Sequence, residues 1–225
     1  MNRLIALGIV GVVGMSLAGA QDKVTFEVPA SSSAKVKHQV DMNLGLMGME
    51  ATVSLKLTRS VEKRSAEGQT LRALIEEMRV EAGGEEIPTP ATDPLIVQAN
   101  PEGLPKSITG GFAEVDMTRL YMTLMFVVPI VEMEKDKPWK QEAKAQGEIP
   151  ALTVETTYLG PDKVGDETLW KFKTSVKEAN GLTAEGQVWA RKDMTIVKQE
   201  VKYSGLPIPA VGAEASGTVT LKLIP

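Results

Sequence analysis

Residues 35–58, with the sequence KVKHQVDMNLGLMGMEATVSLKLT, decide the fold of this chain. Between Val36 and Leu46 the even-numbered positions are apolar except for His38, whereas the odd-numbered positions are polar or glycine. After a glycine-containing turn the parity reverses, and at 53–57 the odd-numbered positions are apolar. Alternation with a period of two is typical of strands that are buried on one face. The stretch therefore predicts a β-hairpin with one face toward a core.

The same alternation recurs in the second half of the chain. Turn signals separate the segments, and Asn180-Gly181 is the strongest because both residues tolerate positive φ. Many strands joined by short turns favour antiparallel pairing over a parallel sheet with helical crossovers. We therefore expect a mainly β fold, in the form of a curved antiparallel sheet or half-barrel. The further candidate strands are 152–159, 169–176, 182–191, 195–203 and 215–223.

One apolar segment in the middle of the chain, residues 116–128, predicts a central helix. Asp116 is a suitable N-cap, and Pro129 ends the apolar pattern. The segment is apolar on almost every side and too short for a bilayer, which needs about 20 residues. We expect it to plug the β-core or to pack in a groove. Before it, the prolines of 88–110 predict an irregular surface segment or a set of edge strands.

Two stretches of the chain resemble each other. Residues 52–82 and 153–179 both run from Thr-Val, through a charged turn with a glycine, to Thr-Leu and then Glu-Ala. The similarity predicts a duplicated β unit, with chance as the alternative because the identities are few. The apolar spacing within 70–82 fits either a helix or a strand, and a true duplication would make it a strand. The predicted units are 34–110 and 137–223, joined by the helix-containing segment 111–136.

The N-terminal segment predicts a secretory signal peptide. Arg3 supplies a positive start, residues 4–13 are apolar, and 18–20 form the small-x-small motif of a cleavage site. Cleavage after Ala20 would leave one β-rich domain, 21–225, in the periplasm or outside the cell. A retained anchor is the alternative, although the apolar run is short for a membrane span. Because the chain has no cysteine, it forms neither a lipoprotein acyl anchor nor a disulfide.

The composition argues against several classes of function. The chain has 25 Lys+Arg against 29 Asp+Glu, a net charge of −4, and lacks the basic footprint of a nucleic-acid-binding protein. With one histidine and no cysteine, it also lacks most routes to a transition-metal site or a histidine-based triad. Sequence motifs of common hydrolases, phosphate-binding loops and calcium sites are absent. We therefore expect no enzymatic activity, no cofactor and no nucleic-acid partner.

His38 and three methionines are the residues that come nearest to a chemical site. The parity of His38 places it on the inward side of the first strand, so we favour a partly buried, hydrogen-bonded imidazole. Met42, Met47 and Met49 lie near it in sequence, and thioethers with an imidazole are ligands for Cu(I). Methionine is also the flexible filler of irregular cores, and this is the interpretation that we favour.

Three short sequence patterns carry a resemblance to other proteins. They are Pro138-Trp139 before a strand, Leu-Gly-Pro at 159–161, and Gly-Asp-Glu-Thr-Leu-Trp at 165–170. Together with the amphipathic strands they resemble uncharacterised exported bacterial β-proteins, and the architecture is similar to the lipoprotein-carrier half-barrels of the Lol type. The resemblance covers 34–223 and implies a curved sheet that wraps apolar helices and holds acyl chains. It rests on pattern, so it gives no single residue a role.

These observations predict a non-enzymatic envelope protein that binds an apolar or amphipathic ligand, such as a lipid or an acyl chain. The alternative is a structural or interaction module with a packed core and no ligand, which would present a sheet edge to a protein or polysaccharide. After signal cleavage we expect no transmembrane span. The predicted ligand-binding residues are Met117, Leu120, Leu124, Met125 and Phe126 from the helix, with Val36, Val40 and Met42 opposite.

Overall fold

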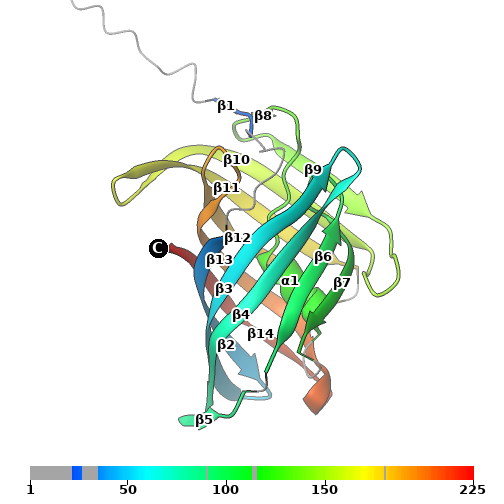
Figure 1. Cartoon of the computed structure of the whole chain (residues 1–225), viewed down its shortest axis with the longest axis vertical. Coiled ribbons are helices and arrows are strands. Elements are labelled where there is room, and N and C mark those ends of the chain that lie inside the picture. Colours follow the sequence, from blue (N-terminus) through cyan, green and yellow to red (C-terminus); the bar gives the residue numbers. More distant parts are fainter. Residues whose placement is uncertain (1–21, 27–34, 90, 113–115, 180) are drawn as a thin grey trace, which may run out of the picture.

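The computed structural model describes residues 22–26, 35–89, 91–112, 116–179 and 181–225. Most of them belong to one antiparallel sheet of 12 strands, which curls around a short helix, α1 (Met117–Leu124; Figure 1). The predicted signal peptide and its cleavage site lie outside the described residues. The strands of this sheet are β2 (Val36–Leu46), β3 (Met49–Ser65), β4 (Gly68–Ala82), β5 (Glu85–Ile87), β6 (Asp93–Ala99), β7 (Pro105–Gly111), β9 (Pro138–Ala143), β10 (Leu152–Val164), β11 (Glu167–Glu178), β12 (Thr183–Ala190), β13 (Ile196–Ile208) and β14 (Ala213–Ile224).

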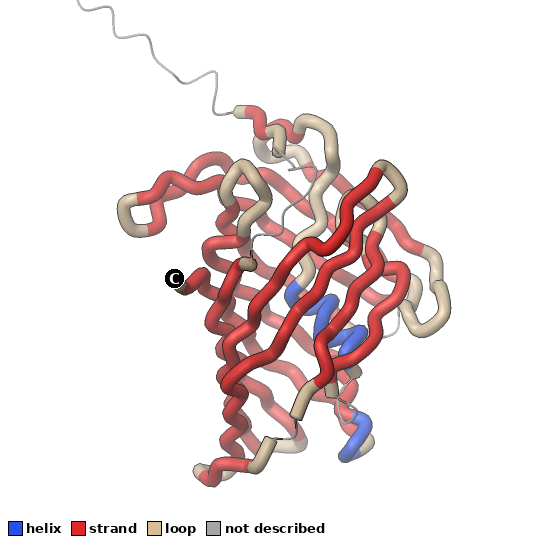
Figure 2. Tube along the Cα trace, in the orientation of Figure 1, coloured by secondary structure: helices blue, strands red, loops and turns tan. Residues whose placement is uncertain are grey.

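The order of the strands shows how the chain builds the sheet. Across it the strands run β7-β6-β4-β3-β2-β14-β13-β12-β11-β10-β9, with β5 beside β4. β14 pairs with β2, which joins the N-terminal strands to the C-terminal ones. β7 and β9 stand at the two ends of this order and are not paired with each other in the described part of the chain, so the sheet is open. The prediction of a mainly β, curved antiparallel sheet is confirmed (Figure 2).

The predicted hairpin forms the centre of the sheet. β2 and β3 pair in an antiparallel register, with Leu46 opposite Met49 across the turn. In the turn Gly48 has a φ of 84°, which glycine adopts without the steric cost that a side chain would add. Val40 lies opposite Leu55, so the two apolar alternations share the concave face of the sheet.

Two segments whose secondary structure the sequence did not determine both contain strands. Residues 70–82 lie in β4 and are therefore strand rather than helix. Residues 88–110 contain β6 and all of β7 except its last residue, and these strands form one edge of the sheet, as the edge-strand interpretation predicted. The two similar stretches both form antiparallel hairpins, β3–β4 and β10–β11, and their origin by duplication stays a prediction. Two short elements complete the fold outside the large sheet: β1 (Lys23–Val24) pairs with β8 (Met133–Glu134), and a 3-10 turn, η2 (Pro209–Val211), joins β13 to β14.

The apolar segment forms α1 and begins as its N-cap predicts. Asp116 Oδ1 accepts a hydrogen bond from the backbone N–H of Arg119 at 3.0 Å. α1 lies inside the curve of the sheet, where it packs against β7, β12 and β13 (Figure 1). Within the described residues, no helix is both long enough and apolar enough to span a membrane.

α1 ends at Leu124, so the prediction of a helix as far as residue 128 is wrong. Met125 is already extended, with φ −71° and ψ 142°. Two residues later the carbonyl oxygen of Val127 accepts a hydrogen bond of 2.6 Å from the hydroxyl of Thr156. This bond gives the carbonyl a partner outside a helix, and the proline at 129 also disfavours helical backbone in the residue before it.

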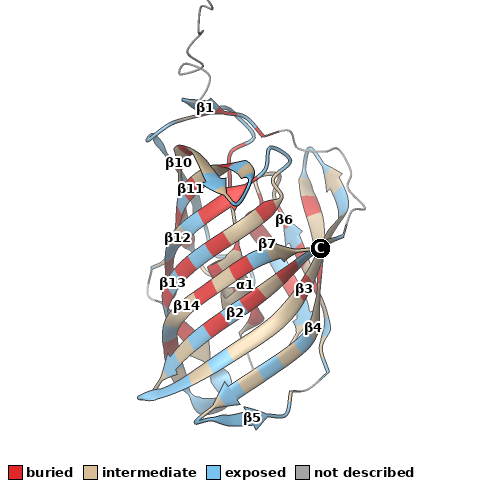
Figure 3. Cartoon of the chain, turned by 90° about the vertical axis from the view of Figure 1, so that its left-hand side faces the viewer, coloured by how far each residue is buried: buried red, intermediate tan, exposed pale blue. Residues whose placement is uncertain are grey.

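The concave face is packed unevenly along the sheet. On β10–β14 most inward side chains are buried, and Tyr158, Phe172 and Leu221 are at most 1% exposed (Figure 3). On β3 and β4 several inward side chains, such as Leu55 and Ile75, are only half-buried. The C-terminal strands therefore hold a close-packed core, whereas the N-terminal strands leave part of their apolar face uncovered.

Candidate functional site

A cavity of about 290 Å³ lies between α1 and the concave face of β2, β3 and β4. Almost all its walls are aliphatic side chains and methionines, because the sheet turns its apolar parity toward α1 at this point. From β3 and β4 the walls include Val53, Leu55, Ile75 and Met78. Five of the eight residues predicted to bind a ligand line it: Val40, Met42, Met117, Leu120 and Leu124.

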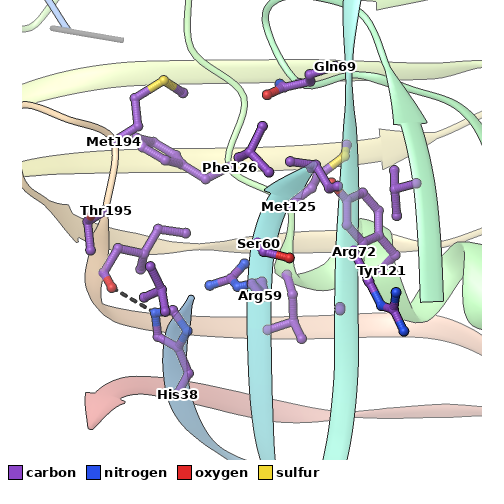
Figure 4. Close-up of a pocket in the computed structure, with 18 of the residues that line it drawn as sticks. His38, Arg59, Ser60, Gln69, Arg72, Tyr121, Met125, Phe126, Met194 and Thr195 are labelled. Carbon is purple, nitrogen blue, oxygen red and sulfur yellow. Dashed lines mark hydrogen bonds between the residues drawn. The ribbon is translucent and has the colours of Figure 1, made fainter. Parts of the chain in front are cut away.

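A second cavity of about 230 Å³ lies beside the first. The remaining predicted residues, Val36, Met125 and Phe126, line this space together with Leu124 (Figure 4). Met125 and Phe126 reach it from the extended segment after α1 rather than from the helix on which they were predicted. The structure therefore brings all eight residues to one of two adjoining cavities, and their binding of a ligand stays a prediction.

Arg59 on β3 and Tyr121 on α1 stand at the boundary of the two cavities and border both. Arg59 is half-buried, and its side chain is partly removed from water where it borders the two cavities. This desolvation lowers the pKa of Arg59, and the nearby Tyr121 opposes the shift. Burial likewise raises the pKa of the Tyr121 phenol to about 12, against the effect of Arg59. Because an arginine side chain does not lose its proton in proteins, Arg59 is charged at neutral pH, whereas the Tyr121 phenol is neutral.

No ion pair or hydrogen bond joins the Arg59 side chain to any residue that the structure describes. The two other arginines around the second cavity each have a side-chain partner. Arg64 donates from Nη2 to Gln69 Oε1 at 2.6 Å. Arg72 forms an ion pair with Glu62, in which Nη1 lies 3.5 Å from Oε1. A charge inside a protein is normally paired, so the arrangement of Arg59 is unusual.

Sequence reasoning missed Arg59, although a signal for it was present. Arg59 has the same odd-numbered parity as Leu55 and Leu57, and that parity places it on the concave face of β3. A charged residue at an inward strand position departs from the binary pattern. The residue is therefore identifiable from the sequence as a polar group on the apolar face.

His38 borders the second cavity from β2 and is buried and hydrogen-bonded, as predicted. Its Nε2 lies 2.8 Å from the carbonyl oxygen of Ile196. Burial, together with the smaller effect of the positive charge of Arg59, lowers the pKa of His38 to about 3, although the hydrogen bond to Ile196 acts in the opposite direction. The imidazole is therefore neutral at pH 7, and its Nε2–H donates a hydrogen bond to the carbonyl oxygen of Ile196. Its Nδ1 has no hydrogen-bond partner among the described residues.

The methionines of the first hairpin do not gather around this histidine. Met42 points into the larger cavity, whereas Met47 and Met49 are 78% and 64% exposed at the turn. The structure thus separates the residue types that the copper interpretation required. Their positions fit the alternative, in which Met42 fills the apolar interior.

Comparisons with known proteins give little direct guidance. No protein-family model matches the chain, and no curated protein matches it. Among solved structures, a Bacteroides fragilis protein of YmcC-like fold is similar at 8% identity, with a TM-score of 0.30, over 89% of this chain and 100% of that chain. A DUF1329 family protein from Desulfovibrio piger is similar at 9% identity, with a TM-score of 0.23, over 86% and 87%. At these TM-scores neither similarity bears on the function of the chain.

Proposed function

We propose that this chain is a non-enzymatic protein of the cell envelope that holds an apolar or amphipathic ligand, such as an acyl chain. The observation that carries this proposal is the aliphatic cavity of about 290 Å³ between α1 and β2–β4. Its volume is close to the lower end of small-molecule sites, which begin at about 300 Å³. The predicted N-terminal signal peptide supports placement in the envelope.

The chemistry of the walls favours an apolar ligand over water. A cavity lined by aliphatic groups offers water too few hydrogen-bond partners, and such cavities stay dry and take up apolar molecules. Met42, Met78 and Met117 are part of the lining. Because methionine side chains are flexible and polarisable, they adapt to ligands of different shape.

Exposed apolar side chains mark a route into the larger cavity. Met47 and Met49 flank the turn that follows Leu46, and Val211 in η2 follows Ile208. Leu46 and Ile208 both line the cavity. Gly45 near the end of β2 pairs with Ser216 near the start of β14, so the β2–β3 turn and η2 lie at the same end of the sheet. This end therefore offers an apolar surface from which a ligand would enter.

The alternative, a module with a packed core and no ligand, has weaker support. It requires a filled interior, and the half-buried face of β3 and β4 leaves space instead. The two open edges, β7 and β9, are its best remaining feature. Edges of this kind occur in many sheets, so they favour no particular partner.

The proposal is tested by native mass spectrometry and organic extraction of the full-length gene product purified from the envelope of a bacterial host. A reproducible co-purifying lipid, or saturable binding of a neutral apolar fluorophore, is the expected result. Leu55→Trp fills the cavity and should abolish binding, while Lys56→Trp on the outer face of the same strand should not. A protein that binds neither lipid nor fluorophore would contradict the proposal and favour the interaction module.

A further inference from the structure

The guanidinium of Arg59, which pairs with no residue that the structure describes, is a charged feature of the cavities that acyl-chain binding alone leaves unexplained. Arg59 borders both cavities, and no residue that the structure describes pairs with it. Figure 4 shows it with His38 on one side and Tyr121 on the other. Burying an unpaired charge destabilises a fold, whereas a partner that brings an opposite charge removes most of that penalty.

We propose that Arg59 binds the carboxylate of a long-chain fatty acid, whose hydrocarbon chain occupies the larger cavity. The proposal rests on the proposed function, and it specifies the head group of the ligand. Guanidinium and carboxylate are planar, and they form two parallel hydrogen bonds in a geometry that a point charge does not provide. The Tyr121 hydroxyl, which stays protonated at neutral pH, stands at the same boundary as a further donor.

The positions of the two cavities match the two ends of such a ligand. Arg59, Tyr121 and Leu124 are common to both linings, so the charged group stands where the spaces meet. On one side lies the aliphatic cavity, and on the other lies the space that also contains His38, Arg64 and Arg72. A fatty acid with its head at Arg59 would place its tail among the aliphatic side chains.

The other charged groups near the head do not replace the missing anion. Asp193 also lines the second cavity, but it is exposed and accepts a hydrogen bond from the backbone N–H of Thr195. His38 is neutral at pH 7 and adds no charge. The second cavity is thus bordered by three arginines and one carboxylate. This balance favours an anionic head over a neutral or cationic one.

The experiment compares two ligands that differ only at the head. Oleic acid and oleyl alcohol have the same chain, and each is titrated against a neutral naphthylamine fluorophore bound to the purified full-length gene product at pH 8. We expect oleate to bind about tenfold more tightly than the alcohol, the difference typical of one charge-assisted interaction. In Arg59→Met the two affinities should become equal, while Arg59→Lys should keep part of the preference. Arg79→Met, at an exposed position of β4, is the matched control and should behave as the wild type.

The outcomes separate this proposal from the one on which it rests. Equal affinities for oleate and oleyl alcohol in the wild type would overturn the role of Arg59 but leave apolar binding intact. Unchanged oleate preference in Arg59→Met would do the same. If the fluorophore does not bind to the protein, both proposals fail. If it binds but neither ligand displaces it, the proposal for Arg59 fails. Because the wild-type comparison needs no variant, the test is decisive even if Arg59→Met does not fold.

Discussion

Arg119 and Glu178 form a two-point ion pair that ties α1 to the end of β11. Arg119 donates from Nε to Glu178 Oε2 at 2.9 Å and from Nη2 to Glu178 Oε1 at 2.6 Å. The side chains are 25% and 11% exposed, so solvent screens the pair only in part. Asp116, the N-cap of α1, also contacts Arg119. The position of α1 above the cavity thus depends on charges at its first turn.

Replacing Glu178 by Gln should lower the free energy of unfolding by about 1–3 kcal/mol, because one charge-assisted partner of Arg119 is lost. Arg119 lowers the pKa of Glu178. The stabilisation from this ion pair is therefore fully present above the ordinary carboxyl pKa of 4.5, and it is lost as the pH falls through the lowered pKa. Urea denaturation at pH 7 and at acidic pH measures both effects. Glu155→Gln, at an exposed position of β10 opposite Lys140, is the control and should have a much smaller effect.

Thr156→Val should also destabilise the protein, by about 1–3 kcal/mol, because it leaves the buried carbonyl of Val127 without its hydrogen bond. Thr157→Val removes a hydroxyl of the same strand that forms no side-chain hydrogen bond to any described residue and should cost less. Thermal denaturation of the two variants compares them directly. Equal losses would show that the bond to Val127 does not hold the segment after α1.

The folded protein should lose stability in acid through His38. The folded pKa is about 3 and the ordinary value is 6.5, so the unfolded chain takes up a proton first as the pH falls. The free energy of unfolding therefore carries no penalty from His38 above pH 6.5. It decreases as the pH falls toward 3, and His38 accounts for a decrease on the order of 4 kcal/mol. His38→Gln preserves a donor to the Ile196 carbonyl but does not titrate. A pH profile of unfolding that is equally steep in this variant would contradict the assignment.

Leu124→Asp tests whether the face of α1 toward the sheet is a ligand-binding surface. Leu124 borders both cavities, so a carboxylate there should reduce binding of a neutral apolar fluorophore and the amount of co-purifying lipid. It should also lower stability by about 2–4 kcal/mol, because an ionisable group replaces an apolar one. Ile130→Asp, at an exposed position after α1, is the control. If folding and ligand content are unchanged in Leu124→Asp, this part of α1 is neither core nor lining.

The sequence predicted those elements whose apolar pattern follows from burial of a single face. β2 and β3 are of this kind, since their alternation matches the concave face. The start of α1 was also readable, because Asp116 caps it through a local hydrogen bond. Its end was not readable, since the partner of the Val127 carbonyl is Thr156 on another strand. Long-range contacts of this kind leave no local pattern.

The cavity itself is a property of tertiary packing. Leu55 and Leu221 are both inward-facing aliphatic residues, yet the first is half-buried and the second completely buried. Which of them borders a space depends on where α1 lies over the sheet, and no strand pattern contains that information. Arg59 is different, because its inward parity is visible in the sequence. What the sequence does not show is that no neighbouring carboxylate reaches it.

The pairing of β2 with β14 also has a consequence for the order of folding. Met42 in the first long strand lies opposite Val219 in the last one, so the middle of the sheet joins the two extremes of the chain. Contacts so distant in sequence form slowly, because a long loop must close before they are made. A growing chain therefore carries an unpaired β2 edge until its last strand has been synthesised. Deletion of β14 would expose the edges of both β2 and β13 at the centre of the sheet, where aggregation begins most readily.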